Sequence, residues 1–245
     1  MENLRGEVEI KQPMNNELSS LFKNFQVVSN EEYERFEAEE EKRKLENNLI
    51  QQQTRFEASG VGEKYFKYSL SDYIAETEEQ KKCLSKVKEA IEKIKRKEPV
   101  TMWLYGNNGN GKTLLSAMII KECGGRFVRS YDIEDELKDT ERFQSEETRT
   151  QFFARYAKYP VLVIDEVGRI KNDNELKYLF HILNDRYENN RSTIIVTNLS
   201  IKELKEYLGK ALVDRFIENC TSVQFTEESF RVKTRKKEME QVKVG

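Results

Sequence analysis

One stretch, GNNGNGKT at residues 106–113, restricts the fold of this chain more than any other feature. Its spacing is Gly106, four residues, and then Gly111, Lys112 and Thr113, which is the pattern of a loop that wraps around phosphate groups. Glycines allow the tight turn, so that successive backbone N–H groups point at one phosphate. The loop lies between the apolar segments VTMWLY and LLSAMII, which predict a strand before it and a helix after it. A glycine- and asparagine-rich turn that fits the pattern by chance is the alternative, and this context argues against it.

The residues of the loop predict a site for ATP. Lys112 should reach the β- and γ-phosphates, and the helix that starts near it should add the positive end of its dipole to the same anion. The Thr113 hydroxyl should ligate Mg²⁺, so ATP and Mg²⁺ are the expected cofactors. The residues expected to contact the nucleotide are Gly106, Asn107, Asn108, Gly109, Asn110, Gly111, Lys112, Thr113 and Leu114.

Composition excludes several classes of protein. The chain has 245 residues, which suits one domain of ordinary size plus an appendage. A net charge of −2 argues against an indiscriminately basic nucleic-acid coat, though not against a local basic patch. Three separated cysteines and one histidine do not form a zinc-finger pattern and fit a reducing compartment. The N-terminus is polar and no apolar run approaches the ~20 residues that span a bilayer, so we expect a cytoplasmic protein without a membrane partner.

Residues 1–57 differ from the rest and are expected to form a helical, polar N-terminal arm that binds a partner. The charged segment 30–53 has only a thin apolar stripe, which is typical of a solvated helix or of a linker that orders on a partner. Gly60 and Gly62 interrupt the pattern, and residues 58–245 should form the second domain. Near the start of the arm, apolar residues recur at helical spacing on a segment too short to bury them alone; these are Met14, Leu18, Leu21, Phe22 and Phe25.

From residue 77 onward, helical and strand patterns alternate. TEEQ (77–80) and SIKE (200–203) are capping-box signatures that open helices, and Gly209 should end the second of these helices. Strands are expected at 100–105, 126–131, 160–165, 192–198 and 221–225. One long helical stretch is expected over 132–158. Such an alternation, joined by short loops, indicates a parallel sheet covered by helices on both sides.

A further helix is expected over residues 174–187. Its apolar residues recur at helical spacing and should form its inward face. They are Leu176, Leu179, Phe180, Leu183 and Tyr187.

The segment VLVIDEVG supplies the acidic residues that a phosphate loop needs for hydrolysis. Its apolar residues predict a strand buried on both faces that ends in Asp165 and Glu166. Asp165 should orient the Mg²⁺ shell, and Glu166 should polarise the attacking water as general base. An ordinary strand that ends in two surface acids is the alternative. Asn198, at the end of the next strand, could sense the γ-phosphate or hold the water, although asparagine also starts turns.

Two arginines are further candidates. Arg215 lies beside Leu212 and Phe216 on a predicted helix, from which it could reach the nucleotide of a neighbouring subunit. Arg231, just past the last strand, could contact the γ-phosphate of its own subunit. By residue type alone, each is more often a plain surface arginine.

The ordered set GNNGNGKT, YDIEDELKDT, VLVIDEVG, IIVTN, LGKALVDRF and ESFR resembles the AAA+ ATPases of the bacterial and phage replicative helicase loader group, the DnaC/DnaI type. The IstB-like transposition helpers are close kin, and the similarity covers residues 58–240. It implies an α/β fold, namely an AAA+ P-loop NTPase whose parallel sheet is flanked by helices, plus the helical N-terminal arm. It also implies that Asn198 is the first sensor, Arg215 the arginine finger and Arg231 the second sensor.

In this group, a helical insertion after the second strand contacts single-stranded DNA, and here it falls on residues 132–150. Lys138, Arg142 and Phe143 are the candidates, because a cation and an aromatic ring suit backbone tracking and base stacking; a solvated helix is the alternative. The chain departs from the group in three places. It lacks ligands for the N-terminal zinc module of some loaders, and Ala211 stands where some relatives carry a basic residue. The asparagines within its phosphate loop are less usual, although backbone N–H groups carry most of the chemistry of such a loop.

The resemblance implies an ATPase that loads the replicative DNA helicase onto single-stranded DNA during replication initiation. It would bind the hexameric replicative helicase through the arm and self-associate through the ATP site. An IstB-like transposase helper ATPase is one alternative, and an adaptor that ATP switches with little turnover is another. The candidate helicase contacts are Leu18, Leu21, Phe22 and Phe25.

Overall fold

Within the residues that the structure describes, five strands form one parallel sheet. Their spatial order is β2-β3-β4-β1-β5, and each neighbouring pair runs parallel. The carboxyl ends of β1, β3 and β4 therefore meet at one edge, where ligands bind in open α/β sheets. The strands are β1 (Thr101–Gly106), β2 (Arg126–Arg129), β3 (Val161–Asp165), β4 (Ser192–Thr197) and β5 (Cys220–Phe225).

This computed structural model describes residues 30–142, 145–170, 173–217 and 219–226. The chain divides into two compact units, residues 1–49 and 50–245, and the boundary falls within α2 (Asn30–Ala58). The division into an arm ending at residue 57 and a domain starting at 58 stays a prediction. No helix in the described ranges is long and apolar enough to cross a membrane. The predicted arm contacts Met14, Leu18, Leu21, Phe22 and Phe25 lie outside the described residues.

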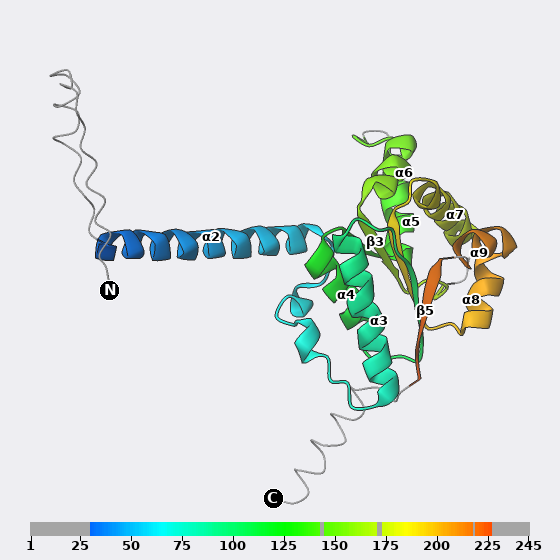
Figure 1. The fold of residues 1–245 in the computed structure, drawn as a ribbon. Helices are drawn as coiled ribbons and strands as arrows, with labels where there is room; N and C mark the ends of the chain where they lie inside the picture. Colours follow the sequence, from blue (N-terminus) through cyan, green and yellow to red (C-terminus); the bar gives the residue numbers. More distant parts are fainter. Residues whose placement is uncertain (1–29, 143–144, 171–172, 218, 227–245) are drawn as a thin grey trace, which may run out of the picture. The chain divides into compact units, whose positions relative to one another are not determined.

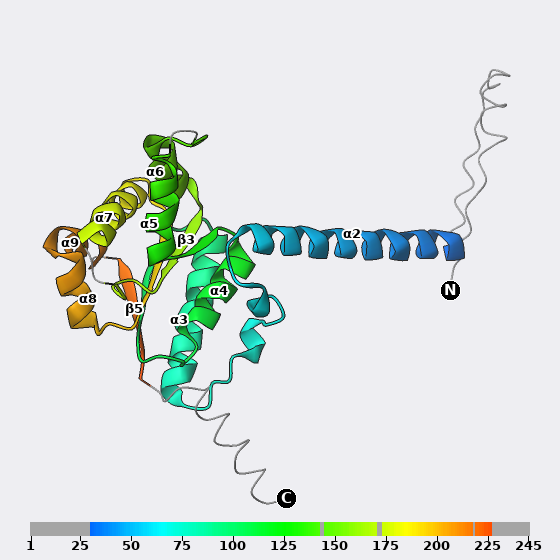
Figure 2. The same ribbon diagram turned by 180° about the vertical axis from the view of Figure 1, so that it is seen from behind.

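Helices cover both faces of the sheet, because residues along each strand point alternately to opposite sides. On β3, Val161 and Val163 join a core with α3 (Glu78–Lys95) and α4 (Lys112–Cys123). Leu162 and Ile164 join a second core on the other face. Figures 1 and 2 show the helices in these two layers. The second layer consists of α5 (Ser130–Asp139), α6 (Arg149–Lys158), α7 (Asp173–Glu188), α8 (Ile201–Leu208) and α9 (Lys210–Ile217).

Local signals set the ends of several helices. Thr77 caps α3, because its hydroxyl accepts from the Gln80 N–H while the Gln80 side chain accepts from the Thr77 N–H. Ser200 and Glu203 make the same pair of bonds at the start of α8. Gly209 follows α8 with a φ of +78°. Both predicted capping boxes and the predicted end of α8 are confirmed.

The prediction of one helix over 132–158 is wrong. Helix α5 ends at Asp139 and α6 begins at Arg149. Thr148 and Gln151 form a third capping box at the start of α6. This pair satisfies backbone N–H groups at the first turn of α6. A second helix therefore begins here, where helical composition alone predicts that one helix continues.

The predicted inward face of α7 is wrong in part. Leu179 and Leu183 are buried, but Phe180 and Tyr187 are each 41% exposed. The buried face is turned around the helix axis and includes two polar residues, Glu175 and Arg186. Apolar spacing cannot predict buried polar groups, which require specific hydrogen-bond partners.

The segment between α2 and α3 contains two short turns, η1 (Glu63–Tyr65) and η2 (Leu70–Asp72). The ammonium of Lys121, on α4, donates to the carbonyl oxygens of Phe66 at 2.5 Å and of Tyr68 at 2.8 Å. Phe56, near the end of α2, is 3% exposed and meets the Phe66 ring edge-on with centroids 5.3 Å apart. The end of α2 is therefore part of the core of the second unit, and it holds this segment against α4.

Candidate nucleotide-binding site

The carboxyl edge of the sheet borders a cavity of about 660 Å³, a volume typical of small-ligand sites. It is lined by residues 108–114 of the phosphate loop and the start of α4, by Asp165 at the end of β3 and Glu166 after it, and by Asn198 after β4. Residues from the segment 65–74 complete its wall. Residues that lie far apart in the sequence, and that were predicted to act together, thus share one cavity.

Glycines let the loop make this shape. Gly106 and Gly111 have φ values of +119° and +94°, which side-chain-bearing residues rarely adopt. A Cβ on Gly106 would lie 2.2 Å from the Phe225 carbonyl oxygen, and one on Gly111 would lie 2.7 Å from the Tyr73 ring. Helix α4 begins at Lys112, and Gly111 provides no side-chain cap. The first N–H groups of α4 are consequently available to an anion.

Lys112 lies folded back on its own loop. Its ammonium donates to the carbonyl oxygens of Gly106 at 2.7 Å and Asn107 at 2.5 Å, and to Asn110 Oδ1 at 3.3 Å. Burial lowers the pKa of Lys112 to about 8, and the negative charge of Asp165 offsets part of this shift. The cation is thus held among neutral oxygens beside the cavity.

The Thr113 hydroxyl donates to Asp165 Oδ2 at 3.0 Å. Asp165 Oδ1 accepts from the Glu166 N–H at 2.8 Å. Burial raises the pKa of Asp165, and these two hydrogen bonds act in the opposite direction. A hydroxyl and a carboxylate side by side are the oxygen donors that suit Mg²⁺, so the pair fits the predicted metal role.

Glu166 has a left-handed backbone with a φ of +60°. Its carboxylate accepts from Arg169 at 2.6 Å while it also lines the cavity. Beside it, Thr197 at the end of β4 donates to the Val167 carbonyl oxygen at 2.7 Å. This bond links the segment after Glu166 to β4, which leads to Asn198. Glu166 and Asn198 therefore line the cavity from the ends of adjacent strands.

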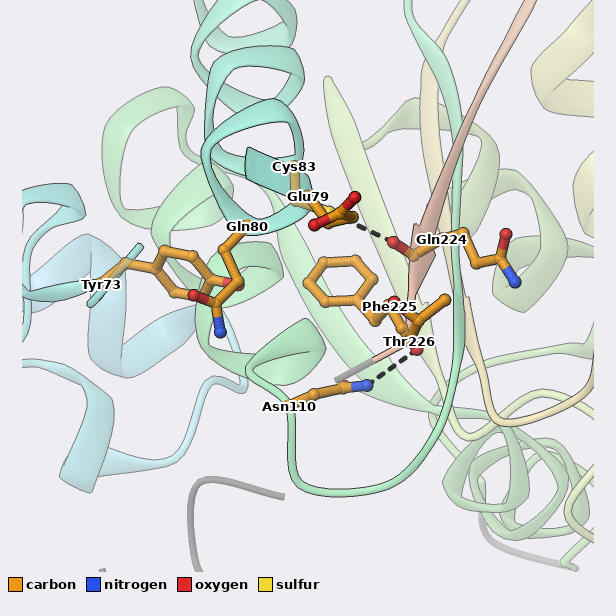
Figure 3. A pocket seen from close by; sticks show the side chains of 8 residues that line it. All are labelled: Tyr73, Glu79, Gln80, Cys83, Asn110, Gln224, Phe225 and Thr226. Carbon is orange, nitrogen blue, oxygen red and sulfur yellow. Dashed lines mark hydrogen bonds between the residues drawn. The ribbon is translucent and has the colours of Figure 1, made fainter. Parts of the chain in front are cut away.

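The asparagines of the loop have a role that sequence reasoning missed. Asn110 Nδ2 donates to the Phe225 carbonyl oxygen at 3.0 Å, and Asn107 Nδ2 donates to that of Thr226 at 3.3 Å. Figure 3 shows Asn110 reaching the end of β5, below the first turn of α3, where Gln80 points to the same small hollow. These side chains thereby link the phosphate loop to the end of β5, and the asparagines themselves were the only signal of this link in the sequence.

An aromatic wall of the cavity was also missed. The cavity is also lined by Tyr65, Tyr68, Tyr73 and Ile74. The stretch EKYFKYSLSDYI is rich in tyrosine, but nothing local in it indicates that it folds back beside the phosphate loop.

The sequence profile of the family described as "IstB-like ATP binding protein" matches residues 14–238. This chain belongs to the IstB-like ATP-binding family. A putative ATP-binding protein of insertion sequence IS232 from Bacillus thuringiensis subsp. berliner is 33% identical over 139 residues, which are 52% of this chain and 54% of that protein. The match thus spans about half of that relative. The replicative helicase loader DnaC of Escherichia coli strain K12 is 28% identical over 201 residues, or 79% of this chain and 81% of DnaC.

Solved structures resemble the IstB-like chain in fold. The DnaC helicase loader superposes with a TM-score of 0.56 at 24% identity, covering 67% of this chain and all of that one. DnaI gives 0.57 at 20% identity, with 71% and 98% covered. AMPPCP-bound DnaA from Aquifex aeolicus gives 0.56 at 21% identity, with 74% and 56% covered. The predicted AAA+ P-loop fold is confirmed.

The remaining predicted residues of the IstB-like chain lie apart from the cavity or outside the described residues. Arg215, on α9, is half-buried and is not among the residues that line the cavity. Lys138 pairs with Glu134 at 3.0 Å, and Arg142 with Asp139 at 2.9 Å, on the exposed surface. Their predicted roles stay predictions. The predicted sites Phe143 and Arg231 lie outside the described residues.

Proposed function

We propose that this IstB-like protein hydrolyses ATP with Mg²⁺ and uses the cycle to load the replicative DNA helicase onto single-stranded DNA during replication initiation. The observation that carries the ATPase part is the shared cavity of Lys112, Asp165, Glu166 and Asn198. These residues supply a cation for the phosphates, oxygen ligands for a metal and a carboxylate for water.

The chain's own residues divide the work of binding. The N–H groups at the start of α4 take the phosphates, and Lys112 exchanges its loop carbonyls for β- and γ-phosphate oxygens. Thr113 and Asp165, already in contact at 3.0 Å, would hold Mg²⁺, which neutralises the charge that develops on the phosphates. The aromatic wall that includes Tyr65 and Tyr73 offers the apolar surface on which the base packs.

Hydrolysis depends on groups that act on water and on the transferring phosphoryl. Glu166 takes the proton of the attacking water as general base, and Asn198 holds that water or senses the γ-phosphate. Arg215 of a neighbouring subunit stabilises the developing charge, which makes self-association through the ATP site part of the proposal. Arg231 contacts the γ-phosphate from its own subunit.

Two variants test this division of roles. Lys112→Ala should abolish ATP binding, because the ammonium acts on the ground-state phosphates. Glu166→Gln should keep ATP binding and stall hydrolysis, because the carboxylate acts on water. Nucleotide affinity and turnover are measured for both, and an equal loss of affinity in the two variants would contradict the assignment.

The loading part is supported by the length of the match to DnaC, which extends over 79% of this chain and 81% of that loader. The hexameric helicase is the proposed partner of the arm, and the segment 132–150, with Lys138, Arg142 and Phe143, is the proposed contact to single-stranded DNA. Both cations are exposed there and form surface ion pairs, which phosphates can displace because such pairs are weak.

A transposase helper is the second candidate, because the family and the relative from insertion sequence IS232 favour it. Co-purification distinguishes the two: a loader retains the replicative helicase, and a helper retains a transposase. Turnover with and without single-stranded DNA tests the third possibility, the adaptor, for which both rates would stay negligible.

A further inference from the structure

Glu175 is a buried carboxylate to which the proposed reaction assigns no role. It lies in the first turn of α7 and is 3% exposed. Its Oε1 accepts from the Ser130 hydroxyl and, at 3.1 Å, from the Gly168 backbone N–H. Its Oε2 accepts from the Tyr207 hydroxyl. These donors belong to the start of α5, to the loop after β3 and to α8, so one side chain fastens three segments to α7.

Gly168 belongs to the same turn as the general-base candidate Glu166. The Arg169 N–H donates to the Glu166 carbonyl oxygen at 3.1 Å and closes this turn. Glu166 and Gly168 both have left-handed backbones, with φ values of +60° and +74°. A side-chain-bearing residue keeps such a conformation only where its surroundings enforce it. The bond from Gly168 to Glu175 is part of that enforcement.

The turn is also fastened on the side of β4. The Val167 N–H donates to the Val196 carbonyl oxygen at 3.1 Å. A Cβ on Gly168 would lie 2.6 Å from the Leu199 side chain and 3.4 Å from the Tyr207 ring. Tyr207 therefore packs beside the turn and also holds, through its hydroxyl, the carboxylate that anchors it.

We propose that Glu175, held by Tyr207, is a positioning residue for ATP hydrolysis. It fixes the turn 166–169 so that Glu166 faces the cavity, and it ties this turn to α8, the helix that precedes the one carrying Arg215. This inference rests on the proposed function and deepens it. When the Tyr207 hydroxyl is removed, a buried carboxylate loses one of its donors, which favours a shift of the side chain toward its other partners. A small displacement of the base is enough to slow catalysis.

The test compares two substitutions in the full-length protein. Tyr207→Phe should lower kcat for ATP hydrolysis about tenfold, the factor that corresponds to about 1.4 kcal/mol, with unchanged ATP affinity. Tyr178→Phe is the matched control. Its hydroxyl is buried in the same cluster but donates to the Ser130 carbonyl oxygen at 2.9 Å, so its loss should lower the melting temperature and leave kcat unchanged. An equal fall of kcat in both variants would overturn the inference.

Amide hydrogen exchange gives a second measurement that does not need turnover. Tyr207→Phe should speed exchange at Gly168 relative to the unsubstituted protein and to Tyr178→Phe, because the acceptor of that N–H is loosened. Equal exchange in all three proteins would overturn the positioning role. If the unsubstituted protein hydrolyses no ATP, the proposed function fails, whereas the exchange at Gly168 still decides whether Glu175 positions the turn.

Discussion

The ammonium of Lys112 is surrounded by its own loop, with only 6% of the residue exposed. In the nucleotide-free protein its pKa is lowered to about 8 by burial. Bound phosphates stabilise the charged form and raise this pKa. The free energy of binding from the ammonium is therefore fully present below pH 8. ATP affinity should fall as the pH rises above 8, by at most about tenfold per pH unit, which titration calorimetry between pH 7 and 10 measures.

The control for this pH dependence is Lys112→Arg. A guanidinium stays charged throughout the same range, so the affinity of this variant, whatever its size, should not decline between pH 8 and 10. The same slope in both proteins would show that another group titrates and that Lys112 is not responsible.

At the scale of single elements, the last turns of α2 belong to the core, whereas its earlier turns are solvated. Phe56 is 3% exposed and Phe36 is 61% exposed on the same helix. Phe56→Ala should lower the free energy of unfolding by about 3–5 kcal/mol, because it leaves a cavity beside Phe66. The matched change Phe36→Ala should cost less than about 0.5 kcal/mol. Denaturant unfolding measures both, and equal costs would contradict this assignment of the two ends of α2.

Helix α9 carries the proposed arginine finger. Arg215→Ala should leave nucleotide affinity nearly intact and remove stimulated hydrolysis, since a finger in trans contributes about 10³–10⁵ in rate in other systems. Mixing Arg215→Ala with Glu166→Gln should restore some turnover, because one kind of mixed interface has both groups intact. If assemblies shown to contain both variants stay inactive, Arg215 acts within its own subunit or has no role.

For the molecule as a whole, the sequence predicted those features that depend on a few neighbouring residues. The phosphate loop, the two acids and the boxes at Thr77 and Ser200 each depend on neighbours within a few residues, so their patterns are legible. The capping box at Thr148, before α6, is equally local. It was missed because the helical composition on both sides of it favoured one continuous helix.

Contacts across the fold were not predictable in the same way. Asn110 bonds to a carbonyl 115 residues away, and the bond from Ser130 to Glu175 spans 45 residues. The tyrosine wall of the cavity likewise depends on how the segment before α3 packs on α4. Such partners come together only in the folded sheet. The spacing of apolar residues indicates whether a segment is a helix or a strand, but it does not indicate which segment packs against it across the core.

The proposed binding of the helicase by the N-terminal arm also concerns the whole molecule, because it assigns partner binding and ATP binding to different parts of the chain. Leu21→Asp together with Phe22→Asp should abolish co-purification of the helicase, because apolar anchors dominate contacts of a helix in a groove. ATP affinity and the melting temperature of the ATPase unit should stay unchanged. Ser19→Asp with Ser20→Asp adds the same charge off the apolar stripe and serves as the control. A large fall in melting temperature after the first change would show that this face is ordinary core, and the docking proposal would be abandoned.

The position of β1 has a consequence for how the protein is made. β1 pairs only with β4 and β5 within the described sheet, and both strands follow it late in the chain. The Asn107 N–H also bonds to the Phe225 carbonyl oxygen at 3.1 Å. During synthesis on the ribosome, β1 therefore stays unpaired until β4 and β5 have been synthesised, because pairing between strands distant in sequence requires both strands. We therefore expect the phosphate loop to reach its folded shape only after β5 has been synthesised, because Asn107 and Asn110 both bond to the end of that strand.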